Sequence, residues 1–186
     1  MSRPAWIFAR GILTRAECDR LVRRYERQRW SGARVLTESG EEAIDRSVRS
    51  AAVKTVRRAA WNGAILRRLD AVLADLNRRL YGFRMATRVE SLQLVRYRRG
   101  DHVQWHMDVA SGERSRRKLG MVVQLTSGDE YEGGRLELFG GPDKATAPRE
   151  VGSLIVFPSY VLHRVTPVTR GVRRCLLGWT VGPRFR

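Results

Sequence analysis

The sequence predicts an α+β fold that is mainly β, a β-sandwich or jelly roll with N-terminal helices packed on one sheet. Residues 14–30 and 54–81 carry apolar side chains at helical spacing, whereas short Val- and Leu-rich stretches separated by turn residues follow from about residue 86. A run of strands after a helical start is typical of helices that cover one face of an antiparallel sheet.

The length of 186 residues predicts one domain, residues 1–186, with 1–85 as a helical N-terminal support and 86–186 as the jelly-roll core. The chain has no run of ~20 apolar residues that would span a membrane, and its N-terminus lacks a secretory layout, so we expect a cytoplasmic protein. Cys18 and Cys175 lie far apart, which argues against a disulfide framework or a zinc–thiolate site.

The N-terminal part is predicted to hold two helical regions. Thr14 and Glu17 form a capping-box pattern at the start of an amphipathic helix over 14–30. Residues 31–50 are polar and are expected to be irregular, with short extended pieces. Residues 54–81 carry an apolar stripe of period 3.6, which predicts one or two helices with a break near Asn62-Gly63.

The C-terminal part is predicted to be a series of short strands. Clusters such as Ser127-Gly128-Asp129 separate them and are typical of turns. The predicted strands are 87–98, 102–107, 118–126, 134–139, 151–157, 160–166 and 173–182.

The formal net charge of +17 comes from 36 Lys and Arg residues against 19 Asp and Glu residues. Such a field attracts polyanions, including nucleic acid, without implying specificity. The arginines are scattered rather than gathered in one tract, so a solvated surface remains the simpler explanation.

Three residues form a candidate metal site. His106 and Asp108 are two positions apart, so on a strand both side chains point to the same side, and His163 follows in a later strand. Two imidazoles and one carboxylate cover one face of an octahedral metal and are the ligand set of non-haem Fe(II) oxygenases. Arg173, ten positions after His163, offers a guanidinium fork for a carboxylate. If their strands are neighbours, Arg173 lies alongside His163.

These residues stand within a longer pattern. The chain resembles the 2-oxoglutarate- and Fe(II)-dependent dioxygenases, specifically their prolyl/lysyl-hydroxylase-like (prolyl 4-hydroxylase alpha-subunit-like) branch, well over 91–181 and loosely over 12–90. The stretches that carry the resemblance are Tyr97-Arg98-Arg99-Gly100 before His106-Met107-Asp108, Tyr131-Glu132-Gly133-Gly134-Arg135-Leu136, Val156-Phe157-Pro158-Ser159, and His163 through Pro167-Val168 and Gly171 to Arg173.

The resemblance implies a double-stranded β-helix that binds Fe(II) through His106, Asp108 and His163. It implies that Arg173 and Tyr97 bind the co-substrate 2-oxoglutarate, and that ascorbate supports activity. The implied reaction uses O₂ to hydroxylate a C–H bond and releases succinate and CO₂. One departure from the family is that the strand over 119–126 lacks a tyrosine that often assists the arginine; Gln124 is among the residues that stand there instead.

The substrate is left open by the sequence. We expect an amino-acid side chain in a protein, a peptide or a free amino acid, and Arg98, His102 and Trp105 are candidate substrate-binding residues. An oxidative demethylase acting on nucleic acid is an alternative suggested by the charge. A metal- or sugar-binding jelly-roll module without turnover is a second alternative.

Overall fold

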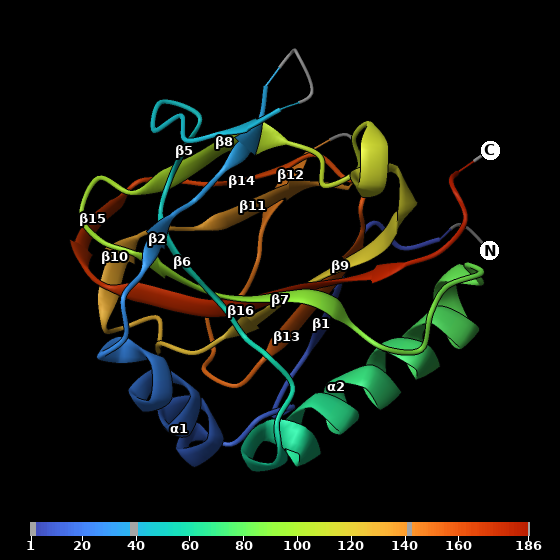
Figure 1. Cartoon of the computed structure of the whole chain (residues 1–186), viewed down its shortest axis with the longest axis horizontal. Coiled ribbons are helices and arrows are strands. Elements are labelled where there is room, and N and C mark those ends of the chain that lie inside the picture. The colour runs from blue at the N-terminus through green and yellow to red at the C-terminus, as the bar shows by residue number, and fades with distance from the viewer. Residues whose placement is uncertain (1–2, 38–40, 141–142, 186) are drawn as a thin grey trace.

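Two antiparallel sheets face each other, and helices cover the outer side of the larger sheet (Figure 1). The computed structural model describes residues 3–37, 41–140 and 143–185. The prediction of a mainly β fold with helices packed on one sheet is therefore confirmed. No helix within the described residues has both the length and the apolar character needed to cross a membrane.

The larger sheet has seven strands, and its central members come from the C-terminal half of the chain. In spatial order the strands are β1 (Ile7–Ala9), β13 (Leu154–Pro158), β9 (Arg117–Gln124), β16 (Arg173–Val181), β7 (Glu90–Tyr97), β6 (Ala52–Thr55) and β2 (Ser31–Gly32). The last two places are filled by short strands from the N-terminal half, so β2 forms one edge.

The smaller sheet carries the polar residues that the sequence singles out. Its order is β12 (Lys144–Thr146), β11 (Leu136–Phe139), β14 (His163–Val165), β8 (His102–His106) and β5 (Arg49–Ser50). Two further pairs complete the strands, β10 (Tyr131–Gly133) with β15 (Val168–Gly171) and β3 (Val35–Leu36) with β4 (Glu42–Ala43).

Alternation of side chains along the larger sheet produces two apolar layers. On β7, Leu94 belongs to the layer between the larger sheet and the helices, and its neighbour Val95 belongs to the layer between the two sheets. On β16 the same alternation places Leu176 against the helices and Cys175 between the two sheets. Successive strand residues point to opposite faces, so both faces of this sheet are buried.

The helices form the lower layer in Figure 1. Helix α1 (Arg15–Glu26) begins with the expected capping box, in which the Glu17 amide donates to the Thr14 hydroxyl and the Thr14 amide donates to the Glu17 carboxylate. Helix α2 (Gly63–Leu76) follows the short 3₁₀ turn η1 (Ala60–Asn62) and continues into the π-helical turn η2 (Asn77–Tyr81).

The predicted helix over 54–81 is correct only from residue 60 onward. Residues 52–55 form β6 instead, paired with β7. Val56 is buried in the core between the helices and the sheet, as its place in the apolar stripe predicts. The segment that carries it is extended and not helical. The break at Asn62-Gly63 is where α2 begins.

Several short strands were not predicted separately. β10, β12 and β15 have three or four residues each, and the 3₁₀ turn η3 (Gly112–Arg116) precedes β9. The N-terminal part is also more than a helical support, because it contributes β1, β2, β5 and β6 to the two main sheets.

Helix α2 is held on the sheet by fully buried leucines, which gives a stability prediction. Leu69 is 0% exposed, whereas Leu80 in η2 is 38% exposed. We expect Leu69→Ala to lower the free energy of unfolding by about 2–5 kcal/mol, because the lost methyl groups leave a cavity. Leu80→Ala should cost less than half of that. Chemical denaturation of both variants measures the difference, and equal losses would contradict this packing.

Candidate metal centre

Two imidazoles lie directly opposite each other on adjacent strands of the smaller sheet. β8 and β14 pair in antiparallel register with His106 opposite His163, and the ring centroids are 4.2 Å apart. Asp108 follows two residues after β8, and the ligand atoms of the three side chains lie within 4.8 Å of one another. The predicted constellation is therefore present in space.

Backbone carbonyls fix the orientation of both rings. The Nδ1 atom of His106 lies 2.9 Å from the Gln104 oxygen, and that of His163 lies 2.9 Å from the Val161 oxygen. A carbonyl oxygen only accepts, so each Nδ1 carries the proton and each Nε2 keeps its lone pair for a metal. Both Nε2 atoms lie 3.8 Å from an Asp108 oxygen.

Asp108 is positioned by its own backbone and by a glycine opposite. Its amide donates to the Ser159 oxygen at 2.9 Å. A Cβ atom on Gly120 of β9 would lie 2.8 Å from Asp108 Oδ2, so only glycine leaves room for the carboxylate in this position. The sequence reading did not identify Gly120 as a site residue.

The protonation states suit a cation. Burial lowers the pKa of His106 to about 4, and the neighbouring His163 acts in the same direction. Burial alone would raise the pKa of Asp108, but the imidazoles of His163 and His106 hold it below its ordinary value. A neutral imidazole and an ionised carboxylate are the forms that bind metal, and at neutral pH His106 and Asp108 are in these forms.

Arg173 reaches the site from the larger sheet, not from a strand beside His163. It begins β16, where it pairs with Tyr97 of β7, whereas β14 pairs with β8 and β11. The expectation of neighbouring strands is therefore wrong. A cavity between the two sheets is nevertheless lined by His106, Asp108, His163, Tyr97 and Arg173 together, so the predicted residues meet across the sandwich.

The guanidinium of Arg173 is buried without a carboxylate partner among the described residues. The residue is 1% exposed, and its Nη2 donates to Gln124 Oε1 at 2.8 Å. Its Nε and Nη1 atoms have no hydrogen-bond partner within the described part of the chain. Its Cζ atom lies 5.2 Å from the centre of the Tyr97 ring. Unsatisfied donors on a buried cation are costly, and an anionic ligand would satisfy them.

Gln124 and Tyr131 complete the surroundings of Arg173 and were not identified as site residues. Gln124 Nε2 donates to the Tyr131 hydroxyl at 2.8 Å, so the amide oxygen is turned toward Arg173. Both residues are buried. Gln124 stands in the strand that lacks the family's usual tyrosine, and Tyr131 lies beside the Glu-Gly-Gly turn. Their place beside Arg173 results from the pairing of strands, which sequence spacing does not reveal.

Two glycines allow the turns beside Arg173 to pack tightly. Gly133 has a φ of +67°, and a Cβ there would lie 2.1 Å from the Pro167 oxygen. Gly171 has a φ of +74°, and a Cβ there would lie 2.3 Å from the Glu130 oxygen. The turn before β11 and the segment leading to Arg173 therefore lie in close backbone contact.

Two arginines beside the metal site were missed. Arg117 stacks with its Cζ 3.9 Å from the centre of the Trp179 ring, and its Nη1 donates to the Asp108 backbone oxygen at 3.3 Å. Arg49 of β5 lines the same cavity as Arg173 and has a buried Nε without a partner. In a chain with so many arginines, no sequence signal distinguishes these two.

Three candidate substrate residues are not brought to the site. Arg98, His102 and Trp105 do not line the cavity between the sheets. They also do not line a second, larger cleft that adjoins the metal site. The His102 ring nitrogens lie 3.0 Å and 3.1 Å from the backbone oxygens of Gly100 and Ser47. Trp105 packs against Phe139, with ring centroids 4.9 Å apart.

The geometry predicts that His163 holds the metal and that His102 does not. We expect His163→Ala to weaken Fe(II) or Co(II) binding roughly 100-fold or more, since losing a group that only orients a ligand already costs ~10–100-fold. His102→Ala should bind as the unaltered protein does. Anaerobic calorimetric titration compares them, and an equal loss in both variants would refute the assignment.

One family model matches the C-terminal half of the sequence. Residues 92–181 match the family model of the 2OG-Fe(II) oxygenase superfamily. A PKHD-type hydroxylase of Synechococcus sp. (strain CC9902) is 35% identical over 102 residues, which is 54% of this chain and 45% of that protein. A PKHD-type hydroxylase of Parvibaculum lavamentivorans is 38% identical over 100 residues, 52% of this chain and 46% of that protein. The chain thus spans about half the length of these curated relatives.

Solved structures match over nearly the whole chain. A prolyl-4-hydroxylase of Pseudomonas putida superposes with a TM-score of 0.75 and 21% identity, covering 97% of this chain and 94% of that one. A prolyl hydroxylase of Trichoplax adhaerens, in complex with a hypoxia inducible factor peptide fragment, gives 0.77 and 15%, covering 96% and 84%. These similarities confirm the jelly-roll fold. Residues 92–181 thus resemble the 2OG-Fe(II) oxygenase superfamily in sequence, and nearly the whole chain resembles prolyl hydroxylases in fold.

Proposed function

We propose that the protein is an Fe(II)- and 2-oxoglutarate-dependent dioxygenase that hydroxylates a C–H bond of an amino-acid side chain. The observation that carries this proposal is the shared cavity, which is lined by the three candidate metal ligands and by Arg173. Arg173 is buried and has no carboxylate partner among the residues that the structure describes. A metal site alone would suit a binding module. A metal site opposite an unsatisfied guanidinium suits an oxo-acid with two carboxylates. One end of such a molecule can chelate the metal, and the carboxylate at the other end can pair with the guanidinium.

Each residue has a distinct part in the proposed site. His106, Asp108 and His163 would hold Fe(II) through two Nε2 atoms and a carboxylate, which leaves the other side of the metal free for ligands. Bound Fe(II) and 2-oxoglutarate supply the oxidising chemistry, which consumes O₂ and yields succinate, CO₂ and the hydroxylated product. The side chain of His106 is 35% exposed, so the proposed metal is reached from the His106 side.

Arg173 would bind the distal carboxylate of 2-oxoglutarate. Two of its three guanidinium nitrogen atoms, Nε and Nη1, have no hydrogen-bond partner among the described residues, and the third, Nη2, donates to Gln124. Tyr97 lines the same cavity, and burial raises the pKa of its hydroxyl to about 12. At neutral pH this hydroxyl is therefore protonated and able to donate a hydrogen bond to the co-substrate.

The substrate class rests on the relatives. The curated relatives are named PKHD-type hydroxylases, and the solved neighbours include prolyl hydroxylases, one of them bound to a peptide fragment. These names support an amino-acid side chain as the target. We also propose that the chain acts as one domain, because β2 and β6 from its N-terminal half complete the larger sheet.

Succinate release tests the proposed function directly. With iron, ascorbate, 2-oxoglutarate and O₂, the unaltered protein should form succinate, and hydroxylatable peptides should stimulate this. Asp108→Ala should abolish succinate formation, because two imidazoles alone do not complete the facial set. Full activity of Asp108→Ala in the same assay would disprove the proposed ligand set.

The co-substrate assignment is tested by two adjacent arginines on β16. Arg173→Ala should raise the 2-oxoglutarate requirement roughly 30- to several-thousand-fold, the equivalent of about 2–5 kcal/mol for a lost buried ion pair. Iron binding should survive. Steady-state kinetics with varied 2-oxoglutarate measures the shift.

Arg174 provides the matched control for this measurement. It points to the other face, where it donates to both carboxylate oxygens of Glu26 on α1 at 3.0 Å and 3.1 Å. Arg174→Ala should therefore lower thermal stability and leave the 2-oxoglutarate requirement unchanged. If the requirement rises for Arg174→Ala and not for Arg173→Ala, the co-substrate site has been misplaced.

A further inference from the structure

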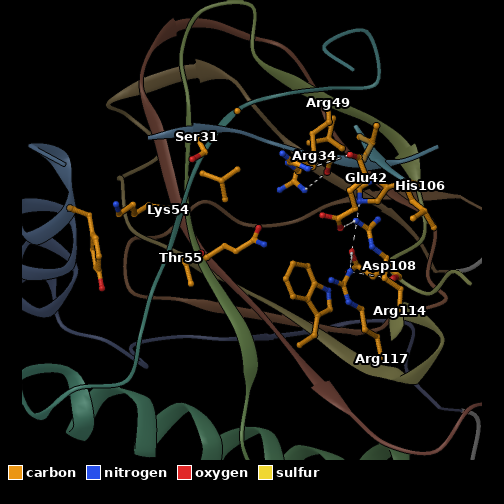
Figure 2. Close-up of a pocket in the computed structure, with 18 of the residues that line it drawn as sticks. Ser31, Arg34, Glu42, Arg49, Lys54, Thr55, His106, Asp108, Arg114 and Arg117 are labelled. Carbon is orange, nitrogen blue, oxygen red and sulfur yellow. Dashed lines mark hydrogen bonds and ion pairs between the residues drawn. The ribbon is translucent and has the colours of Figure 1, made fainter. Parts of the chain in front are cut away.

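A wide cleft opens beside the candidate metal centre. It has a volume of about 930 Å³, and His106 and Asp108 form part of its wall. The cleft extends from these residues past β3 and β6 to Arg24 and Tyr25 of α1. Figure 2 shows Arg34, Arg49, Arg114 and Arg117 around the metal end, with Lys54 and Ser31 further along. Arg173 is not part of this wall, so the cleft is separate from the proposed co-substrate anchor.

The wall of the cleft is strongly cationic. Seven lining side chains are Arg or Lys, whereas two are carboxylates, Glu42 and Asp108. Asp108 belongs to the proposed metal site, so Glu42 is the one carboxylate left to balance the cations among the described lining residues. A cleft of one charge sign concentrates ligands of the opposite sign.

Most of these cations have only neutral partners. Two of the seven do meet a carboxylate: Arg114 forms an ion pair with Glu42 at 2.6 Å, and Arg117 Nη1 lies 4.0 Å from an Asp108 oxygen. Arg34 donates to the Glu42 backbone oxygen at 3.3 Å, and Arg49 donates to the Arg34 backbone oxygen at 3.5 Å. Lys54 donates to the backbone oxygen of Arg29 at 3.2 Å. Backbone carbonyls satisfy donors without neutralising charge, so the cleft retains an excess of positive charge.

The shape of the cleft favours an extended peptide over a nucleic acid. Strands β2 and β5 are the edge strands of the two sheets, and their residues Ser31, Gly32 and Arg49 line the cleft. A free strand edge offers backbone groups to an extended chain. Single-stranded nucleic acid is usually bound on aromatic stacking platforms. The rings of Tyr25 and Trp61 are engaged with each other, with centroids 6.0 Å apart.

We propose that the prime substrate is an acidic peptide segment, in which Asp or Glu residues flank the side chain to be hydroxylated. The flanking carboxylates bind the cations of the cleft, including Arg34 and Lys54, while the target side chain reaches the metal end. This inference rests on the proposed function for the reaction, and on the charge and shape of the cleft for the substrate class.

Peptide binding tests the inference without turnover. The probe is a short fluorescent peptide with a central proline flanked by glutamates, compared with versions in which glutamine or lysine replaces glutamate. The full chain is loaded with Mn(II) and 2-oxoglutarate, and binding is followed by fluorescence anisotropy. We expect the glutamate peptide to bind about tenfold or more tightly than the glutamine peptide, and the lysine peptide to bind least.

Three charge reversals locate the binding site. Arg34→Glu and Lys54→Glu should each weaken binding of the glutamate peptide about tenfold. Arg67→Glu makes the same charge change on the exposed side of α2, outside the cleft, and should alter binding less than twofold. Arg34 is itself exposed, so its replacement tests charge rather than folding. Equal weakening in all three variants would mean that only the overall field attracts the peptide, and would overturn the inference.

Two further measurements separate the possible failures. An oligothymidylate of equal charge that binds more tightly than the peptide, and depends on Arg34 and Lys54, would overturn the inference in favour of nucleic acid. Succinate formation without peptide reports on the proposed function alone. If succinate forms but the peptides are not distinguished, the inference fails and the proposed function stands. If the peptides are distinguished but no iron-dependent succinate forms, the cleft assignment stands and the proposed function fails.

Discussion

The burial of one guanidinium without a carboxylate partner among the described residues is the constraint on which the site depends. Placing Arg173 between two sheets costs several kcal/mol unless its donors are satisfied. The fold satisfies only part of the guanidinium, through the amide oxygen of Gln124 and the face of the Tyr97 ring. Arg173 lines a cavity that is also lined by two imidazoles and a carboxylate. A preorganised charge with an incomplete set of partners is what an anion site requires.

Much of the fold follows from local patterns in the sequence. Short Val- and Leu-rich stretches between turn clusters predicted the main strands, and the capping pattern at Thr14 and Glu17 correctly placed the start of α1. The errors occurred where tertiary contacts override local periodicity. Val56 has the spacing of a helix residue, yet the pairing of β6 with β7 keeps the chain before it extended. Strands of three or four residues, such as β10 and β15, are too short to carry a period of their own.

The candidate site was predictable in composition but not in architecture. His106, Asp108 and His163 have few equivalents in the chain, so their spacing was informative. Arg173 was expected beside His163, but β15 and a crossing to the other sheet intervene. Gln124 lies 49 positions from the arginine it contacts, and it was noted only for the tyrosine it replaces. Arg49 and Arg117 resemble many other arginines until strand pairing places them beside the metal site.

The short strands at the sheet edges have a consequence for motion. β2 and β5 have two residues each and are paired on one side only, whereas β8 retains β14 as a partner on its other side. Segments with few backbone hydrogen bonds open locally at a small fraction of the global free energy of unfolding. The wall of the cleft can therefore fray and re-form while the pair of strands carrying both imidazoles stays closed. In a hydrogen-exchange experiment, the amides of β2 and β5 should exchange quickly, whereas those of β8 and β14 should be protected.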